Sequence, residues 1–487
     1  MHDYCYLKRT DPLRLKLGSA SAFDTDRIEK EVTVGLKIGM VSTRFAGLDG
    51  VSLESAKWAE VLEAMGHRCY WLAGELDRPK NRSMLLPEAH FQAARNGWIN
   101  DRVLGCRRRS SQATTVIHDL RAFLKTRVNH FLDRFKIDVL IVENALAIPM
   151  HIPLGLAITE IIAERALPAI LHHHDFFWER ARYAENAVAD FLRTAFPPTL
   201  PSAEHVVINS MAQRQLAYRC GLSATLIPNV MDFERPPEFS PGYQRSVLET
   251  MGILPQDTII LQPTRVIQRK GIEHAVDLVR ALKRPNCKLV VSHAAGDEGF
   301  AYANWLKRYA ANHRVDLRLL EIPPSPQNGA PAGLPQQYQQ LGALYDRCDF
   351  VTFPSRREGF GNALLEAIYF RKPVLVNRYE TFARDIEPLG FDLVTMDGLL
   401  DERQIGEVEH ILSCPERKDE MTRRNFEIAR HHFSYRRVHS RLKAVLDKLG
   451  ATISAAPRIT ACRHHRTVIP IKPAPVAAVS RPKCDHR

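Results

Sequence analysis

Residues 350–369 read Phe350-Val-Thr-Phe-Pro-Ser-Arg-Arg-Glu358-Gly-Phe-Gly-Asn362-Ala-Leu-Leu-Glu366-Ala-Ile-Tyr369. The first four residues are β-branched or aromatic, which is typical of a buried strand, and Pro354 ends that strand. The two glycines let backbone approach a ligand closely, and Asn362 is predicted to cap a helix. These elements predict an anion site, because free N–H groups and the positive end of the helix dipole face one point.

Two carboxylates flank this predicted site. Glu358 lies in the loop, and Glu366 lies one turn into the helix, with its side chain leaning back toward the helix start. A carboxylate is unexpected beside a phosphate site unless it binds an uncharged group, such as a sugar or ribose hydroxyl. Helix capping and turn chemistry explain the same residues, so the stretch alone leaves both interpretations open.

Length and charge limit the classes of protein that fit. A chain of 487 residues is too long for one core and predicts two domains with extra segments. The net charge is +12, and residues 451–487 contribute about half of it, with seven Lys/Arg and one Asp. The remaining body is mildly basic, which fits an anionic small substrate. A specific nucleic-acid partner is not expected, because the basic tail lacks interleaved aromatic residues. The basic tail could instead make a peripheral contact with a membrane surface.

Cysteine usage and hydropathy predict a cytoplasmic protein. The nine cysteines are scattered, without a CxxC pair, which is typical of a reducing compartment. The first 35 residues lack the apolar core of a signal peptide. The longest apolar stretch, residues 145–171, is interrupted by Pro149, His151, Pro153 and Glu160, so no transmembrane segment is expected.

The order of strand-like and helix-like segments predicts an α/β fold with two Rossmann-like domains that face each other across a cleft. Residues 74–110 and 323–335 are predicted to be long loops. The predicted segments are an N-terminal extension (1–35), a first Rossmann-like domain (36–230), a linker (231–255), a second Rossmann-like domain (256–415), C-terminal helices (416–450) and a disordered basic tail (451–487).

A second candidate site follows the predicted strand 258–262. Arg265 and Lys270 lie in a loop that opens a helix. Arginine offers a bidentate fork to phosphate and lysine a point charge, so the pair could hold a diphosphate and stabilise the charge of a leaving group. The competing interpretation is a solvated basic turn. The loop around Glu358, predicted on the same sheet edge, favours the phosphate site.

The first domain has its own polar clusters after strands. Residues 172–174 are three consecutive histidines, but neighbouring residues of an extended segment point to opposite faces and cannot easily chelate one ion. No metal site is therefore predicted, and a histidine could instead bind a sugar hydroxyl or the reaction centre. Asp175 and Glu179, which follow the histidines, are further candidate site residues. Gly47 and Gly50 form a second possible anion loop, whose spacing does not match a dinucleotide fingerprint.

Together these motifs resemble the retaining glycosyltransferases of family 4, which have a GT-B architecture. The resemblance covers about residues 36–449. It rests on Arg265-x4-Lys270, on Pro354-Ser-x-x-Glu358-Gly-Phe-Gly-x4-Glu366-Ala, and on Lys372-Pro-Val.

The resemblance implies a UDP- or GDP-sugar donor, held mainly by a nucleotide-sugar-binding second domain (256–415). It also implies an acceptor on the side of the first domain (36–230), with Asp175 and Glu179 as candidates, and C-terminal helices (416–450) that cross back to the first domain. The donor-binding residues would be Arg265, Lys270, Gly359, Phe360, Gly361, Asn362, Glu366, Gly47 and Gly50. Among them, Glu366 would bind the ribose. Glu358 would act on the donor sugar as a catalytic residue. A histidine of the run 172–174, either His173 or His174, would match the active-site histidine of the family.

The expected reaction is sugar transfer with retention, by departure and attack on one face, to a carbohydrate, lipid or small-molecule acceptor. No cofactor is expected to be required, and Mg²⁺ is not expected to be essential, because two cations and a helix start can neutralise the diphosphate. A sugar-nucleotide epimerase or a phosphorylase of the same two-domain architecture is the alternative.

Overall fold

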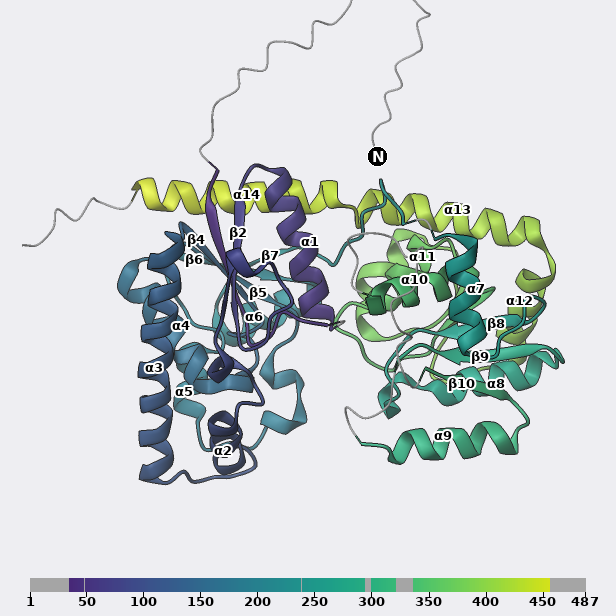
Figure 1. The fold of residues 1–487 in the computed structure, drawn as a ribbon, viewed down its shortest axis with the longest axis horizontal. Coiled ribbons are helices and arrows are strands. Elements are labelled where there is room, and N and C mark those ends of the chain that lie inside the picture. Colours follow the sequence, from purple (N-terminus) through teal and green to yellow (C-terminus); the bar gives the residue numbers. More distant parts are fainter. Residues whose placement is uncertain (1–34, 48, 238, 294–298, 321–335, 456–487) are drawn as a thin grey trace, which may run out of the picture. The chain divides into compact units, whose positions relative to one another are not determined.

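The computed structural model describes residues 35–47, 49–237, 239–293, 299–320 and 336–455 (Figure 1). The predicted N-terminal extension lies outside these ranges except for its last residue. The predicted loop 323–335 and residues 456–487 of the predicted tail also lie outside them.

Seven parallel strands form the first sheet, in the order β3-β2-β1-β4-β5-β6-β7. They are β1 (Lys37–Val41), β2 (Arg68–Ala73), β3 (Ser83–Leu85), β4 (Val139–Glu143), β5 (Ala169–His173), β6 (Ala203–Val207) and β7 (Ala224–Leu226). The helices between them are α1 (Gly50–Ala64), α2 (Ala94–Val103), α3 (Ser111–Phe135), α4 (Ile152–Arg165), α5 (Ala189–Ala195) and α6 (Ser210–Cys220).

Both faces of this sheet are covered, which explains why β4 is apolar at every position before Glu143. Successive side chains of a strand point to opposite faces. Leu140 and Val142 accordingly pack in the core under α3 and α4. Val139 and Ile141 pack in a second core with Trp58 of α1.

Six parallel strands form the second sheet, in the order β10-β9-β8-β11-β12-β13. They are β8 (Thr258–Gln262), β9 (Cys287–Val291), β10 (Asp316–Leu319), β11 (Phe350–Phe353), β12 (Val374–Asn377) and β13 (Val394–Met396). Its helices are α7 (Pro241–Thr250), α8 (Ile272–Leu282), α9 (Ala301–Asn312), α10 (Gln336–Arg347), α11 (Asn362–Tyr369) and α12 (Glu402–Ser413). The predicted fold class, two α/β domains with parallel sheets, is therefore present.

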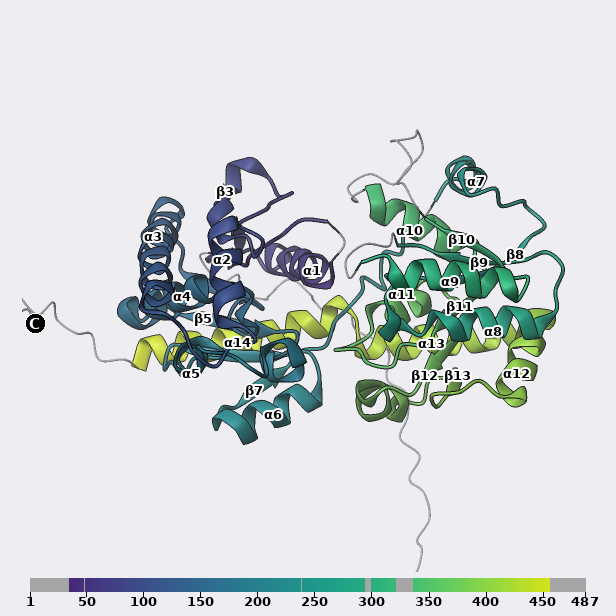
Figure 2. The same cartoon turned by 90° about the horizontal axis from the view of Figure 1, so that it is seen from below.

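The two last helices, α13 (Pro415–His432) and α14 (Tyr435–Ala455), pack on different sheets. Phe426 of α13 lies in the core of the second sheet, with residues of α11. Val438 and Leu442 of α14 lie in the core of the first sheet, with residues of α1. The two helices follow one another at the yellow end of the colour bar (Figure 2).

Three predicted segments differ from the structure. The predicted linker 231–255 contains α7, whose Tyr243 and Val247 are buried because they recur at helical spacing, and Ser240 caps that helix. The predicted loop 74–110 contains β3 and α2. The predicted tail begins too early, because α14 continues to Ala455. Prolines and polar residues had obscured the short apolar periodicity of these elements.

Candidate active site

The loop between β11 and α11 is built around Gly361. This residue has a φ of 112°, and a Cβ placed on it would lie 2.2 Å from the hydroxyl of Tyr379. Tyr379 in turn donates a hydrogen bond to the carbonyl of Phe360, at 2.7 Å. The predicted N-cap is wrong by one residue, because Gly361 occupies that position and Asn362 is the first residue of the helix. A glycine is needed here because a side chain would collide with Tyr379 and strain the backbone.

The side chain of Phe360 does not line this loop. It is buried in the core and meets the ring of Phe433 edge-on, with 5.3 Å between ring centroids. Phe360 can therefore contribute only backbone to a ligand site, although the sequence placed it among the donor-binding residues.

Lys270 and Glu358 form an ion pair at the carboxyl edge of the second sheet. Lys270 is buried, and this burial lowers its pKa, while the charge of Glu358 acts in the opposite direction. Gly271 makes the approach possible, because it has a φ of 62° and a Cβ on it would lie 2.7 Å from the carbonyl of Pro354. The turn after β8 therefore packs directly against the end of β11.

Two arginines add positive charge to this pair. Arg265, which is exposed, lies close enough to lower the pKa of Lys270 further. Nη1 of Arg269 lies 3.6 Å from Oε2 of Glu358. The sequence argument did not include Arg269, although its position next to Lys270 was the available signal. The structure thus brings the predicted cations and Glu358 together.

Glu366 is more enclosed than the sequence suggested. It is 7% exposed and accepts a hydrogen bond from the Tyr345 hydroxyl at 3.0 Å. Burial raises the pKa of Glu366, and the charge of Lys57 on α1 opposes this effect. Glu366 therefore lies behind the loop, at the side of α11 that faces Tyr345.

The predicted glycine loop of the first sheet meets α11. Gly47 has a φ of 75°, and its N–H donates to Asp77 at 2.9 Å. A Cβ on Gly50 would lie 3.2 Å from Nδ2 of Asn362. Asn362 also accepts a hydrogen bond from Asn229 at 2.5 Å. The first glycine loop and the start of α11 are thus neighbours, as a shared ligand would require.

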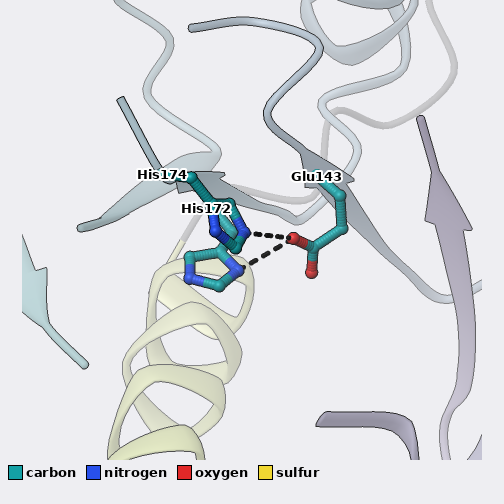
Figure 3. A group of neighbouring side chains, drawn as sticks. All are labelled: Glu143, His172 and His174. Carbon is teal, nitrogen blue, oxygen red and sulfur yellow. Dashed lines mark hydrogen bonds and ion pairs between the residues drawn. The ribbon is translucent and has the colours of Figure 1, made fainter. Parts of the chain in front are cut away.

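The three histidines at the end of strand β5 (Ala169–His173) divide between two faces. His172 and His174 point to the same face, and each donates to Oε2 of Glu143, at 2.9 and 3.2 Å (Figure 3). His173 points to the opposite face, where its Nε2 lies 3.0 Å from Nδ1 of His205. Burial lowers the pKa of His173 well below its usual value. The geometry therefore favours His174 over His173 for contact with a substrate.

Burial would raise the pKa of Glu143, but the charges and hydrogen bonds of His172 and His174 outweigh burial and lower it. For His174, burial lowers the pKa, and the hydrogen bond and charge of Glu143 raise it above the usual histidine value. Burial keeps the pKa of His172 low. The sequence argument missed Glu143, because a carboxylate at the end of an apolar strand has no motif around it.

Asp175 and Glu179 hold the segment after β5. Asp175 accepts from Asn144 at 3.1 Å and pairs with Arg180. Glu179 accepts from the backbone of Phe176 at 3.1 Å, and Arg357 lies 3.5 Å from its carboxylate. Burial raises the pKa of Glu179. Both predicted acceptor-side carboxylates are therefore already engaged by protein groups.

Further bonds connect the loops at the ends of the two sheets. Nδ2 of Asn209 donates to the carbonyl of Gly359 at 2.7 Å. The N–H of Ser210, at the start of α6, donates to Asp385 at 2.7 Å. A Cβ on Gly359 would lie 3.2 Å from the carbonyl of His174. The loop that carries Glu358 therefore lies against the segment that carries His174.

Comparison with known proteins identifies the family of this chain. The family model of the glycosyl transferases group 1 matches residues 333–427, which include Glu358 and α11. Mannosylglucosylglycerate synthase of Thermotoga maritima is 32% identical over 428 residues, which are 81% of this chain and 95% of that protein. The chain belongs to the group 1 glycosyltransferases.

A second relative and two solved structures are also similar to this glycosyltransferase. Mannosylglucosylglycerate synthase of Petrotoga mobilis is 29% identical over 74% of this chain and 86% of its own length. A glycosyltransferase of Rickettsia africae superposes with a TM-score of 0.62 at 12% identity, over 87% of this chain and 100% of that structure. Sucrose-phosphate synthase of Thermosynechococcus elongatus superposes with a TM-score of 0.60 at 13% identity, over 85% of this chain and 99% of that structure. These structures confirm the predicted GT-B fold.

Among the described residues of this glycosyltransferase, no helix is long and apolar enough to span a membrane.

Proposed function

We propose that this glycosyltransferase is a retaining, family 4 enzyme that uses a nucleoside-diphosphate-sugar donor and forms mannosylglucosylglycerate or a close analogue. The contact of Lys270 with Glu358, beside the glycine start of α11, carries the donor half of this proposal. The similarity to mannosylglucosylglycerate synthase over 95% of that protein supports the product.

In this proposal the donor diphosphate lies between the basic turn and the helix start. Arg265 and Lys270 contact its oxygens, and the first N–H groups of α11 point at the same charge. Glu358 then exchanges Lys270 for a hydroxyl of the donor sugar. The buried Lys270 suits this exchange, because a charge in a low-dielectric site interacts strongly with an incoming anion.

The reaction breaks the bond between the anomeric carbon and the diphosphate oxygen. The acceptor hydroxyl attacks the same face and forms the new glycosidic bond, and its proton passes to the departing diphosphate. Nucleoside diphosphate and the glycoside are the products, so atoms and charge balance. Arg265 and Lys270 stabilise the charge that develops on the leaving group. A divalent cation is therefore not expected to be essential.

The relatives' name indicates a mannosyl donor and a glucosylglycerate acceptor, which carries one carboxylate at neutral pH. In this arrangement the acceptor is held by the first domain, at the side of His174, Asp175 and Glu179. His174 is the residue of the histidine run that we place beside the reacting sugar, because His173 is bonded to His205 on the other face.

The test combines a donor screen with product analysis. Thermal stability is measured with GDP- and UDP-linked mannose and glucose, because a donor at about 100 times its Kd stabilises the fold by about 2.7 kcal/mol. The binding donor is then incubated with glucosylglycerate, with and without EDTA, and the anomeric configuration of the product is read by NMR. Transfer with retention supports the proposal. Inversion, or strict dependence on added metal, would contradict the mechanism.

A further inference from the structure

One oxygen of Glu143 serves two histidines. Glu143 ends β4, and His172 is its partner in the register of the neighbouring strand β5. Nδ1 of His172 and Nε2 of His174 both lie within hydrogen-bond distance of Oε2, and Figure 3 shows both rings turned toward it. Glu143 and His172 are fully buried and His174 is 8% exposed, so His174 is the member of the cluster nearest to solvent.

The ring of His172 is fixed by aromatic packing. The indole of Trp58, on α1, stacks on it with 4.0 Å between centroids and 17° between planes. The ring of His174 lies 4.4 Å from the same imidazole. Because His172 cannot turn without disturbing Trp58, it holds the carboxylate of Glu143 in one orientation.

The bonds also determine where the protons lie. His172 donates through Nδ1, and its Nε2 has no hydrogen-bond partner among the described residues, as expected for a neutral ring in an apolar setting. His174 donates through Nε2, which leaves Nδ1 for another group. Oε1 of Glu143 is buried and likewise unpaired within the described ranges. One negative charge is thus stabilised chiefly by the two imidazoles, and a single imidazolium would neutralise it.

We propose that Glu143 is a positioning residue that holds His174, through Nε2, as an imidazolium with Nδ1–H presented to the sugar being transferred, while neutral His172 orients the carboxylate. This inference rests on the proposed transfer reaction and adds a residue that its motif does not contain. The backbone carbonyl of His174 lies against Gly359, so the segment that carries this histidine is next to the loop that carries Glu358. An imidazolium at this point donates a charge-assisted hydrogen bond to a sugar hydroxyl, which holds the sugar in place while its bond to the diphosphate breaks.

The charges that face the cluster favour this state. Glu54 of α1 is buried and acts with Asp175 to raise the pKa of His174. Lys57 is 3.1 Å from Glu54 and offsets part of that negative charge. His173 and His205, on the opposite face of β5 and on β6, stay neutral because burial lowers the pKa of each. Glu143 is the charged group in direct contact with His174.

A metal ion is the competing occupant of the cluster. The ligand atoms of Glu143, His172 and His174 lie within 4.8 Å of one another. Three ligands of this kind would suit a catalytic zinc site with an open fourth position for water, whereas Glu143 and His172 are fully buried here. Two hydrogen bonds to one carboxylate oxygen account for the same distances without an ion.

The experiment uses the full chain and the variants Glu143→Gln and Glu143→Asp. Glu160→Gln is the matched control, since Glu160 pairs with Lys125 on the surface between α3 and α4 and contacts none of these residues. The pKa of His174 is followed by NMR of histidine-labelled protein, with His174→Asn used for assignment. Transfer rates are measured against pH, and unfolding is measured on every variant.

With Glu143→Gln, we expect the pKa of His174 to fall by at least one unit and kcat to fall about 100-fold near neutral pH. The active form is protonated, so the wild-type rate declines as pH rises through the pKa of His174. In Glu143→Gln we expect this decline at lower pH. In Glu143→Asp the pH of the decline should return part of the way to the wild-type value. The control keeps the wild-type profile.

An unchanged pKa of His174 and an unchanged pH profile in folded Glu143→Gln would overturn the inference. So would stoichiometric zinc that is lost with Glu143→Gln. If the pKa falls as expected but no donor and acceptor are turned over, the positioning of His174 stands and the proposed function fails. The two failures are therefore distinguishable.

Discussion

The carboxyl edges of the two sheets hold charge in different ways. At the second sheet, Lys270 and Glu358 come from neighbouring loops and neutralise each other directly. At the first sheet, Glu143 is balanced by two imidazoles on one strand, packed under Trp58. In the proposed function, the first arrangement opens when the donor diphosphate binds, because its members lie on loops. The second arrangement is rigid and is suited to orienting one group.

Removal of Lys270 should have the largest effect. Lys270→Ala deletes a contact to the leaving diphosphate and leaves Glu358 with less compensation, so we expect kcat/KM to fall by roughly 10²–10³. Steady-state kinetics would measure this, with Lys443→Ala as the control, because Lys443 is exposed on α14. A near-normal rate would show that the basic turn is not a phosphate site.

Substitutions of two histidines of the first sheet should separate an effect on transfer from an effect on stability. His174→Gln should lower transfer by about 100-fold with little change in unfolding, as expected for a group that acts in the transition state. His173→Gln should mainly destabilise, by about 1–3 kcal/mol, because it leaves the buried His205 without its partner. Transfer rates and denaturant unfolding, measured on both variants, test this prediction. The reverse pattern would assign the active-site role to His173.

The loop at α11 can be strained by one methyl group. Gly361→Ala should destabilise by about 1–3 kcal/mol, because alanine would meet the Tyr379 hydroxyl and disfavours the positive φ. Removing the hydroxyl in Gly361→Ala/Tyr379→Phe should recover part of the loss in a double-mutant cycle. Additive effects in that cycle would mean that the contact with Tyr379 is not the cause.

The smallest effect is a pH dependence of stability from the first sheet. Burial lowers the pKa of His205 to about 4, whereas an unfolded histidine titrates near 6.5. The unfolded state therefore binds more protons between these values, so this contribution is complete above pH 6.5 and is lost as the pH falls toward 4. Between pH 7.5 and 5 we expect a loss of roughly 2 kcal/mol from this group. Denaturant unfolding at both values measures it, and His205→Asn should flatten the change.

Local rules were sufficient for much of the fold. Strands β8 and β11 were predicted with their observed ends, because a short run of β-branched and other apolar residues is a local property. Helix α7 and strand β3 were missed, because their apolar residues are few and gain stability only from packing partners that are distant in sequence.

For the site, residue types and spacing in the sequence predicted that Arg265, Lys270 and Glu358 belong to one functional group. The approach of Lys270 to Glu358 across 88 positions follows from the order of strands β8 and β11, which parallel pairing makes adjacent. Tertiary structure alone decided that His172 and His174 share a face and that both bond to Glu143. A side chain's face and partners depend on strand register and on the neighbouring layer, and neither is written in a local pattern.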